Sequence, residues 1–192
     1  MPKGTTQTRL QNIAKEGAQV DIQELNYDDC VRLAAKEADE TPRGVIVQDT
    51  AWDGYEEIPA WIMQGYVTMA MEAGEQLKAQ GCERPTHIFV QAGVGSLAGA
   101  VVGYFSNLYA DNLPTFVVVE AEAAACLYKG AAAGESGAAP FGALAAMMTM
   151  DEYKDLRNDI GLDENSKVLL FSTEGDTDPD RYKNIVWKGL DK

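Results

Sequence analysis

The sequence predicts an α/β protein, a three-layer open parallel sheet with flanking helices. Short apolar runs such as residues 88–90 and 115–120 alternate with longer segments in which apolar residues recur every three to four positions. Strands that alternate with helices form a parallel sheet through right-handed crossovers. A strand, a glycine turn and a helix follow one another over residues 86–108, and the rest of the chain is organised around this junction.

The first 50 residues predict two helices and two short strands. Helical spacing and terminal cap residues define the helices, and Asn26 caps the second of them. Short runs rich in β-branched residues define the strands. Two strands are few for an independent sheet. The predicted elements are a helix over 5–16, a strand over 19–22, a helix after Asn26, a turn at 42–44 and a strand over 45–47.

The later part of the chain continues the alternation. Its longest helix carries methionines and aromatic residues at helical spacing, which we expect in the core rather than against a ligand. Tyr66 is one of them. The predicted elements are helices over 60–79 and 100–108, strands over 88–90, 115–120 and 167–171, a short helix through 126–129, a helix ending near 150, a charged helix over 151–159 and a last amphipathic helix carrying Tyr182 and Trp187.

Composition restricts the classes of function. The 192 residues carry 30 acidic and 16 basic side chains, a formal net charge of −14, which disfavours nucleic acid and acidic membranes and favours a small-molecule ligand. Three dispersed cysteines argue for a reducing compartment. The chain shows no membrane-spanning run and no signal core, so we expect a cytoplasmic protein. The single histidine, His87, favours a structural role, and we expect no metal site.

The glycine junction has the composition of a phosphate site. Gly93, Gly95 and Gly99 lie between an apolar strand and a helix of small residues. Glycine lets the backbone take positive φ and approach an anion, and a helix N-terminus supplies unpaired N–H groups. The alternative is a tight turn without a ligand. Context must distinguish the two.

A polar and aromatic loop over residues 48–59 follows a predicted strand. The carboxyl ends of parallel strands are where ligands bind in open α/β sheets, so Asp49 and Asp53 are candidate acid–base groups. The alternative is a solvated loop whose aspartates cap the next helix.

Two phosphate ligands fit the glycine junction. In a dinucleotide fold, Glu120 at the end of the next strand would bind a ribose hydroxyl, although the glycine spacing departs from GxGxxG. In an enzyme that uses pyridoxal 5'-phosphate (PLP), the same glycines would hold one phosphate, and a hydroxyl from a late strand would meet the pyridine nitrogen. Ser172 meets that second requirement.

Six sequence blocks, spread over nearly the whole chain, resemble those of a known family. This family is the diaminopropionate ammonia-lyases, PLP-dependent enzymes of fold type II. The blocks are Asn-Tyr-Asp-Asp at 26–29, Gln-Asp-Thr-Ala-Trp-Asp-Gly-Tyr at 48–55, Ile-Pro-Ala-Trp-Ile-Met-Gln-Gly-Tyr at 58–66, Gln-Ala-Gly-Val-Gly at 91–95, Gly-Glu-Ser-Gly-Ala at 134–138 and Ser-Thr-Glu-Gly-Asp-Thr-Asp at 172–178.

The resemblance implies α,β-elimination of 2,3-diaminopropionate to pyruvate and ammonia. It implies that Asp49 acts as one base with Tyr27 nearby, that Ser172 contacts the pyridine nitrogen and that Glu135 lies near the ring. The residues that it implies for the phosphate are Gly93, Val94, Gly95, Ser96 and Leu97.

The chain departs from the family at two places. Its start resembles an interior point of the family, and we expect the segment with the Schiff-base lysine to be absent. The flanks of a long family insert are joined near 130–134. The resemblance then makes residues 1–50 a remnant of the small domain and 51–192 a partial large PLP-binding domain. We expect a chain that is inactive alone and self-associates or dimerises; the alternative is a non-catalytic phosphate-ligand or dinucleotide-binding module.

Overall fold

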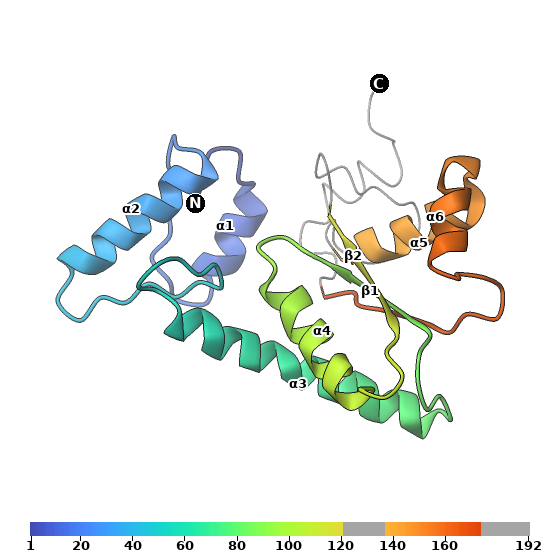
Figure 1. The fold of residues 1–192 in the computed structure, drawn as a ribbon. Helices are drawn as coiled ribbons and strands as arrows, with labels where there is room; N and C mark the ends of the chain where they lie inside the picture. The colour runs from blue at the N-terminus through green and yellow to red at the C-terminus, as the bar shows by residue number, and fades with distance from the viewer. Residues whose placement is uncertain (121–136, 174–192) are drawn as a thin grey trace. The chain divides into compact units, whose positions relative to one another are not determined.

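The computed structural model describes residues 1–120 and 137–173, and the chain divides into two compact units between Val47 and Gln48 (Figure 1). The smaller unit holds two helices with side-chain caps. Thr6 Oγ1 accepts a hydrogen bond from the Arg9 N–H at 3.4 Å, and Asn26 Oδ1 accepts one from the Asp29 N–H at 2.9 Å. The predicted cap at Asn26 is confirmed. The helices are α1 (Gln7–Ala14) and α2 (Tyr27–Glu40).

The two strands predicted in the smaller unit are wrong. Residues 19–22 and 45–47 form no strand in the structure. Val45 and Val47 are 66% and 69% exposed. A strand needs a neighbouring strand to pair its backbone groups, and an apolar run alone does not supply one. The assignment of the units to a small and a large domain stays a prediction.

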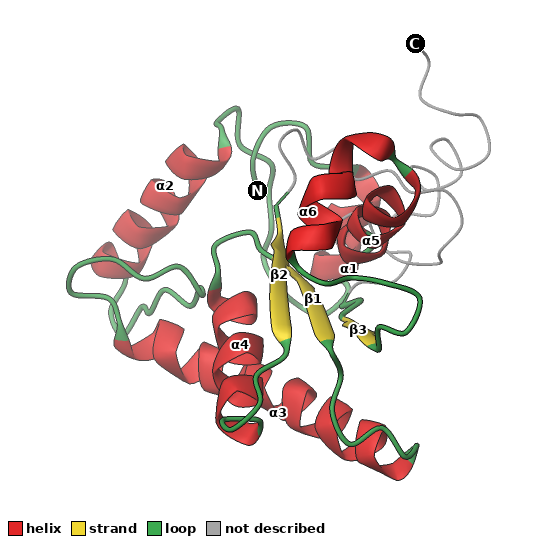
Figure 2. Cartoon of the chain, turned by 45° about the vertical axis from the view of Figure 1, so that its right-hand side comes forward, coloured by secondary structure: helices red, strands yellow, loops and turns green. Residues whose placement is uncertain are grey.

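The larger unit is built on a three-stranded parallel sheet with strand order β2-β1-β3 (Figure 2). In the register of the sheet, Phe89 of the central strand lies opposite Val117 on one side and Leu170 on the other. Each predicted strand of this unit is confirmed, and no end differs from the prediction by more than one residue. The strands are β1 (His87–Gln91), β2 (Thr115–Val119) and β3 (Val168–Leu170).

The central strand is buried on both faces, which makes the larger unit three layers thick. Ile88 and Val90 pack with Ala70 and Phe105 of the helices on one face. Phe89 points to the opposite face, where it packs with Met147. Successive side chains of a strand point to opposite faces, so this alternation requires helices on both sides. The predicted α/β class is confirmed.

Two helices of the larger unit begin earlier than the sequence suggests. The first long helix starts at Glu57 and the helix after the glycine turn starts at Ser96, four residues before the expected position. The helices predicted through 126–129 and 182–187 lie outside the described residues. The helices are α3 (Glu57–Ala79), α4 (Ser96–Leu108), α5 (Ala139–Thr149) and α6 (Lys154–Asp159), with a 3₁₀ turn at Asp151–Tyr153 before α6.

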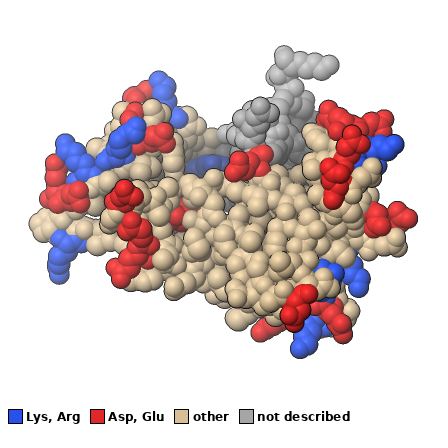
Figure 3. Space-filling view, viewed as in Figure 1, with Lys and Arg blue, Asp and Glu red and all other residues tan. Residues whose placement is uncertain are grey.

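The face of the larger unit formed by α3 and α4 carries few charges. Figure 3 shows uncharged residues over the middle of this face and acidic and basic residues gathered toward its ends. Trp61 of α3 is 57% exposed and Leu108 of α4 is 48% exposed. Within residues 1–120 and 137–173, no helix combines the length and apolar character that a bilayer crossing requires.

Truncating the centre of the sheet tests the three-layer core. Phe89→Ala should lower the free energy of unfolding by about 3–5 kcal/mol, because the fully buried ring leaves a cavity between β1 and α5. Phe141→Ala is the matched control, since Phe141 is 47% exposed on α5, and it should cost less than about 1 kcal/mol. Urea unfolding followed by circular dichroism measures both. Equal losses would contradict the proposed core.

Candidate cofactor and acid–base site

The junction between β1 and α4 presents, at one point, backbone N–H groups that the helix itself does not pair. Gly95 is the N-cap of α4 with φ 95°, a left-handed conformation that favours glycine. The N–H of Gly99 donates to the Gly95 carbonyl at 2.8 Å, the first bond of the helix. The N–H groups of Ser96, Leu97 and Ala98 precede this bond and have no partner within the helix. Such a first turn can hold an anion.

Open space lies beside the glycine loop. A Cβ added to Gly93 or Gly95 would meet no atom within 4 Å. Val94 between them is 50% exposed. Glycine is therefore required at Gly95 by the backbone angle, whereas at Gly93 its absent side chain leaves room for a ligand to approach.

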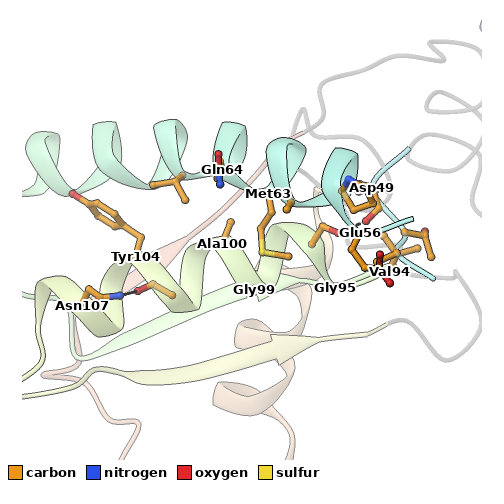
Figure 4. Close-up of a pocket in the computed structure, with 17 residues that line it drawn as sticks. Asp49, Glu56, Met63, Gln64, Val94, Gly95, Gly99, Ala100, Tyr104 and Asn107 are labelled. Atoms are coloured by element: carbon orange, nitrogen blue, oxygen red, sulfur yellow. Dashed lines mark hydrogen bonds between the residues drawn. The ribbon is translucent and has the colours of Figure 1, made fainter. Parts of the chain in front are cut away.

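A groove of 850 Å³ runs between α3 and α4 and ends at this loop (Figure 4). Tyr104 and Asn107 lie toward one end, and Asp49, Glu56 and Val94 gather at the other. Asp49 and Glu56 are the charged members of the groove lining within the described part of the chain, and no lysine or arginine is among the lining residues there. A phosphate at this end would be held by neutral N–H groups and the helix dipole.

Two hydrogen bonds hold Asp49, one at its main-chain carbonyl and one at its carboxylate. The buried Ser96 hydroxyl donates to the main-chain carbonyl of Asp49 at 2.5 Å. The Tyr66 hydroxyl donates to Asp49 Oδ2 at 3.3 Å. Burial and then the neighbouring Asp49 carboxylate raise the pKa of the Tyr66 phenol above its ordinary value of 10.0. The carboxylate predicted as a base is thus held beside the phosphate-ready turn, by which we mean the glycine loop over 93–95 and the first turn of α4.

The loop that carries Asp49 closes on itself. The Gln48 N–H donates to the Tyr55 hydroxyl at 3.0 Å, and the rings of Trp52 and Tyr55 stack 4.2 Å apart. Gly54 turns the chain with φ 85°. These contacts explain the aromatic and glycine residues of the 48–55 block. Asp53, the other candidate acid, is exposed and does not line the groove.

Ser172 lies at the same edge of the sheet as the glycine loop. It is exposed two residues beyond β3, and β3 pairs in parallel with β1. The Phe171 N–H donates to the Phe89 carbonyl at 3.3 Å, which extends that pairing toward Ser172. The Ser172 hydroxyl and the first turn of α4 therefore both follow the carboxyl ends of neighbouring strands, β3 and β1.

Gln91 is a residue of the site that the sequence reading missed. It is buried at the end of β1, and its Nε2 donates to Thr173 Oγ1 at 2.7 Å, which ties β1 to the segment of Ser172. Its Oε1 is buried without a partner. The signal was a polar residue that ends an otherwise apolar strand just before the glycines. Tyr66 was also missed, because its helical spacing favoured the core.

The structure does not test the positions predicted for two site residues. Tyr27 is the first residue of α2 in the smaller unit and is 59% exposed. Glu135 lies outside the described residues. The side chain of Leu97 packs against the hydrophobic core, so only its N–H is available to a ligand. The roles predicted for Tyr27 and Glu135 stay predictions.

His87 is structural, as predicted. The side chain is buried, and Nε2 lies 2.9 Å from the Ile160 carbonyl oxygen while Nδ1 lies 2.8 Å from Thr86 Oγ1. A carbonyl only accepts hydrogen bonds, so Nε2 carries the proton that it donates. The imidazole therefore connects β1 to the end of α6.

The site combines a helix N-terminus that can hold a phosphate with a nearby carboxylate. Comparison with known proteins identifies the class of enzyme to which the chain belongs. Residues 1–168 match the family described as pyridoxal-phosphate dependent enzyme. The chain belongs to this family. The match favours PLP over a dinucleotide as the ligand of the glycine loop.

Within that class the chain is similar to diaminopropionate ammonia-lyases. The enzyme of Salmonella typhimurium strain LT2 is 40% identical over 256 residues, covering 98% of this chain and 63% of the relative. The crystal structure of the Escherichia coli enzyme in apo form matches with a TM-score of 0.86 and 38% identity, covering 98% and 60%. The Escherichia coli enzyme in complex with D-serine matches with a TM-score of 0.86 and 34% identity, covering 98% and 63%.

The comparisons confirm the resemblance that the sequence predicted. The chain spans about 63% of the length of the curated relatives. The alignment with the first of them has 256 positions, more than the 192 residues of the chain, so that relative carries internal residues without a counterpart here. The predicted position of this difference, near 130–134, lies outside the described residues.

Exchanging two glycines for alanine tests the turn. Gly95→Ala should cost about 1–2 kcal/mol, because alanine resists the left-handed conformation, and it should weaken binding of inorganic phosphate. Gly103→Ala, in the interior of α4 with open space around it, should instead gain up to about 1 kcal/mol and leave phosphate binding unchanged. Urea unfolding and calorimetric titration measure these effects. The same sign of stability change in both variants would contradict the assigned backbone geometry.

Proposed function

We propose that this chain carries the PLP-binding part of a diaminopropionate ammonia-lyase, acting on 2,3-diaminopropionate by α,β-elimination to pyruvate and ammonia. The observation that supports it is that the first turn of α4 and the Asp49 carboxylate lie together in one groove. The similarity to diaminopropionate ammonia-lyases supports the substrate class.

The residues present fit the phosphate of PLP. In the proposal, the N–H groups of Ser96 and Leu97 bind the phosphate, with Gly93, Val94 and Gly95 shaping the turn. Ser172 contacts the pyridine nitrogen as a neutral hydroxyl, which suits elimination because the nitrogen is left largely unprotonated. Bound PLP withdraws electrons from the amino acid and makes its α-proton acidic.

Asp49 takes the role of base in this proposal. Its carboxylate accepts the α-proton on an oxygen as the carbon–hydrogen bond breaks, the electron pair of that bond goes to form a double bond between the α and β carbons, and the protonated β-amino group leaves as ammonia. The Tyr66 hydroxyl stays protonated near neutral pH, since its pKa lies above 10.0, and it donates to the same carboxylate. From the family resemblance alone, we propose that Tyr27 and Glu135 also take part in the reaction.

The described groove lining contains no lysine, so we propose that this chain binds PLP without a covalent bond and has little activity alone. Removal of the α-proton should then depend on Asp49, even where the complete elimination is slow.

Proton exchange in D₂O tests the proposed chemistry. With PLP and diaminopropionate, the chain should exchange the substrate α-proton for deuterium faster than PLP alone, as measured by ¹H NMR. Asp49→Asn should return exchange to the rate of PLP alone, because it removes the basic oxygen pair while keeping a similar side-chain shape. Borohydride should leave no lysine labelled with the cofactor.

Three results would overturn parts of this proposal. Exchange at the rate of PLP alone, with PLP bound, would remove Asp49 from the role of base. Pyruvate release at an enzymatic rate would show that the chain is active alone, and a labelled lysine would show where the cofactor is anchored.

We also propose that the chain self-associates and acts in the cytoplasm. Exposed Trp61, Met63 and Met71 on α3 support association, because exposed apolar surface favours burial against another molecule. Unbridged Cys30 and Cys82 fit a reducing compartment.

Sedimentation velocity measures the association. Trp61→Glu should shift the chain toward monomer by placing a charge on the apolar face of α3, whereas Met148→Glu on α5, with Met148 38% exposed, should leave the distribution unchanged. A wild-type chain that is monomeric at all concentrations would contradict the proposal.

A further inference from the structure

We propose that Ser96 and Tyr66 are positioning residues that hold Asp49, and that the Ser96 hydroxyl serves Asp49 rather than the phosphate. This inference rests on the proposed role of Asp49 as a base. It also changes the role of Ser96, which the family resemblance places among the phosphate ligands.

The Ser96 hydroxyl has one proton, and the structure shows where it goes. Ser96 is 5% exposed, and its Oγ lies 2.5 Å from the Asp49 carbonyl oxygen across 47 positions of sequence. A carbonyl accepts and cannot donate, so the hydroxyl proton points to Asp49. A phosphate oxygen would need the same hydroxyl proton, because it too only accepts hydrogen bonds. Since that proton is donated to Asp49, only the backbone N–H of Ser96 is available to an anion.

Tyr66 contacts the side-chain carboxylate of Asp49. Its hydroxyl donates to Asp49 Oδ2 at 3.3 Å, which is long for an O–H···O bond. Alone, this contact would orient the carboxylate weakly. Together with the Ser96 bond to the main chain, it restrains Asp49 at both its backbone and its carboxylate.

The two contacts join separate elements at one residue. Ser96 begins α4 and Tyr66 lies in the third turn of α3, so Asp49 is held by both helices that border the groove. An anion bound at the first turn of α4 and a proton acceptor at Asp49 would therefore keep a fixed separation. Elimination needs such a fixed geometry between the held cofactor and the base.

The Tyr66 phenol reports where the Asp49 carboxylate is. Its pKa is raised by burial first and by Asp49 second, and a raised phenol pKa means that the neutral form is favoured. Removing or displacing the carboxylate should therefore lower the pKa of Tyr66. A side chain that only stabilises the fold would leave this titration unchanged.

NMR of ¹³C-labelled tyrosine rings, with Tyr66→Phe used to assign the signal, tests the inference in the ligand-free chain. Asp49→Asn should lower the pKa of Tyr66, and Ser96→Ala should lower it in the same direction. Ser106→Ala, on the same helix, is the matched control and should leave it unchanged. An unchanged Tyr66 titration in folded Ser96→Ala would overturn the inference.

Two further measurements separate Ser96 as a positioning residue from Ser96 as a phosphate ligand. Ser96→Ala should speed amide exchange of residues 48–55 about fivefold, the loss expected for one hydrogen bond of about 1 kcal/mol. Its affinity for inorganic phosphate should stay within about twofold of wild type, because the N–H groups remain. A tenfold loss of phosphate affinity with unchanged exchange would overturn the inference.

The same experiments keep the proposed function separate. If the wild-type chain binds neither inorganic phosphate nor PLP, the proposed cofactor site fails. The Tyr66 titration and the amide exchange of residues 48–55 still decide whether Ser96 holds Asp49, because both are measured without ligand.

Discussion

The burial of β1 on both faces is the constraint on which the rest of the larger unit depends. Ile88 and Val90 are buried against the helices α3 and α4, and Phe89 is buried against α5. Because both faces of β1 are covered, its residues can reach a ligand only at the ends of the strand. At the carboxyl end the chain must turn sharply to begin α4. Gly95 makes this turn with positive φ, and the turn leaves unpaired N–H groups at the sheet edge. The site follows from the packing.

This packing explains how an acidic protein can present an anion site whose described lining contains no basic side chain. The net charge is −14, and Asp49 and Glu56 are the charged groups in the described groove lining. Backbone N–H groups and the dipole of α4 supply the favourable field, at about 0.3–1 kcal/mol for a charge at an exposed helix terminus. Their position depends on the fold rather than on side chains. The cost is that the nearby carboxylates oppose the phosphate.

The sequence predicted the features that depend on local pattern and missed those that depend on partners. The alternation of apolar runs predicted β1, β2 and β3, and the glycines predicted the turn. Residues 45–47 show the same pattern but are no strand, since a strand needs a partner that local sequence does not reveal. The hydrogen bonds of Asp49 to Ser96 and Tyr66 join residues 47 and 17 positions apart. Such pairings come from tertiary packing, so spacing could not give them.

The phosphate-ready turn and the candidate base differ in how the fold controls them. The turn is fixed by backbone geometry at Gly95, and any side chain that tolerates the helix can follow it. Asp49 lies on a loop, so its position depends on specific side chains that bind its carbonyl and its carboxylate. These hydrogen bonds add to the contacts within the loop, between Gln48 and Tyr55 and between the rings of Trp52 and Tyr55. A change at Ser96 or Tyr66 should therefore alter proton transfer while cofactor binding is retained, whereas a change at Gly95 should affect both, because α4 carries Ser96 with it.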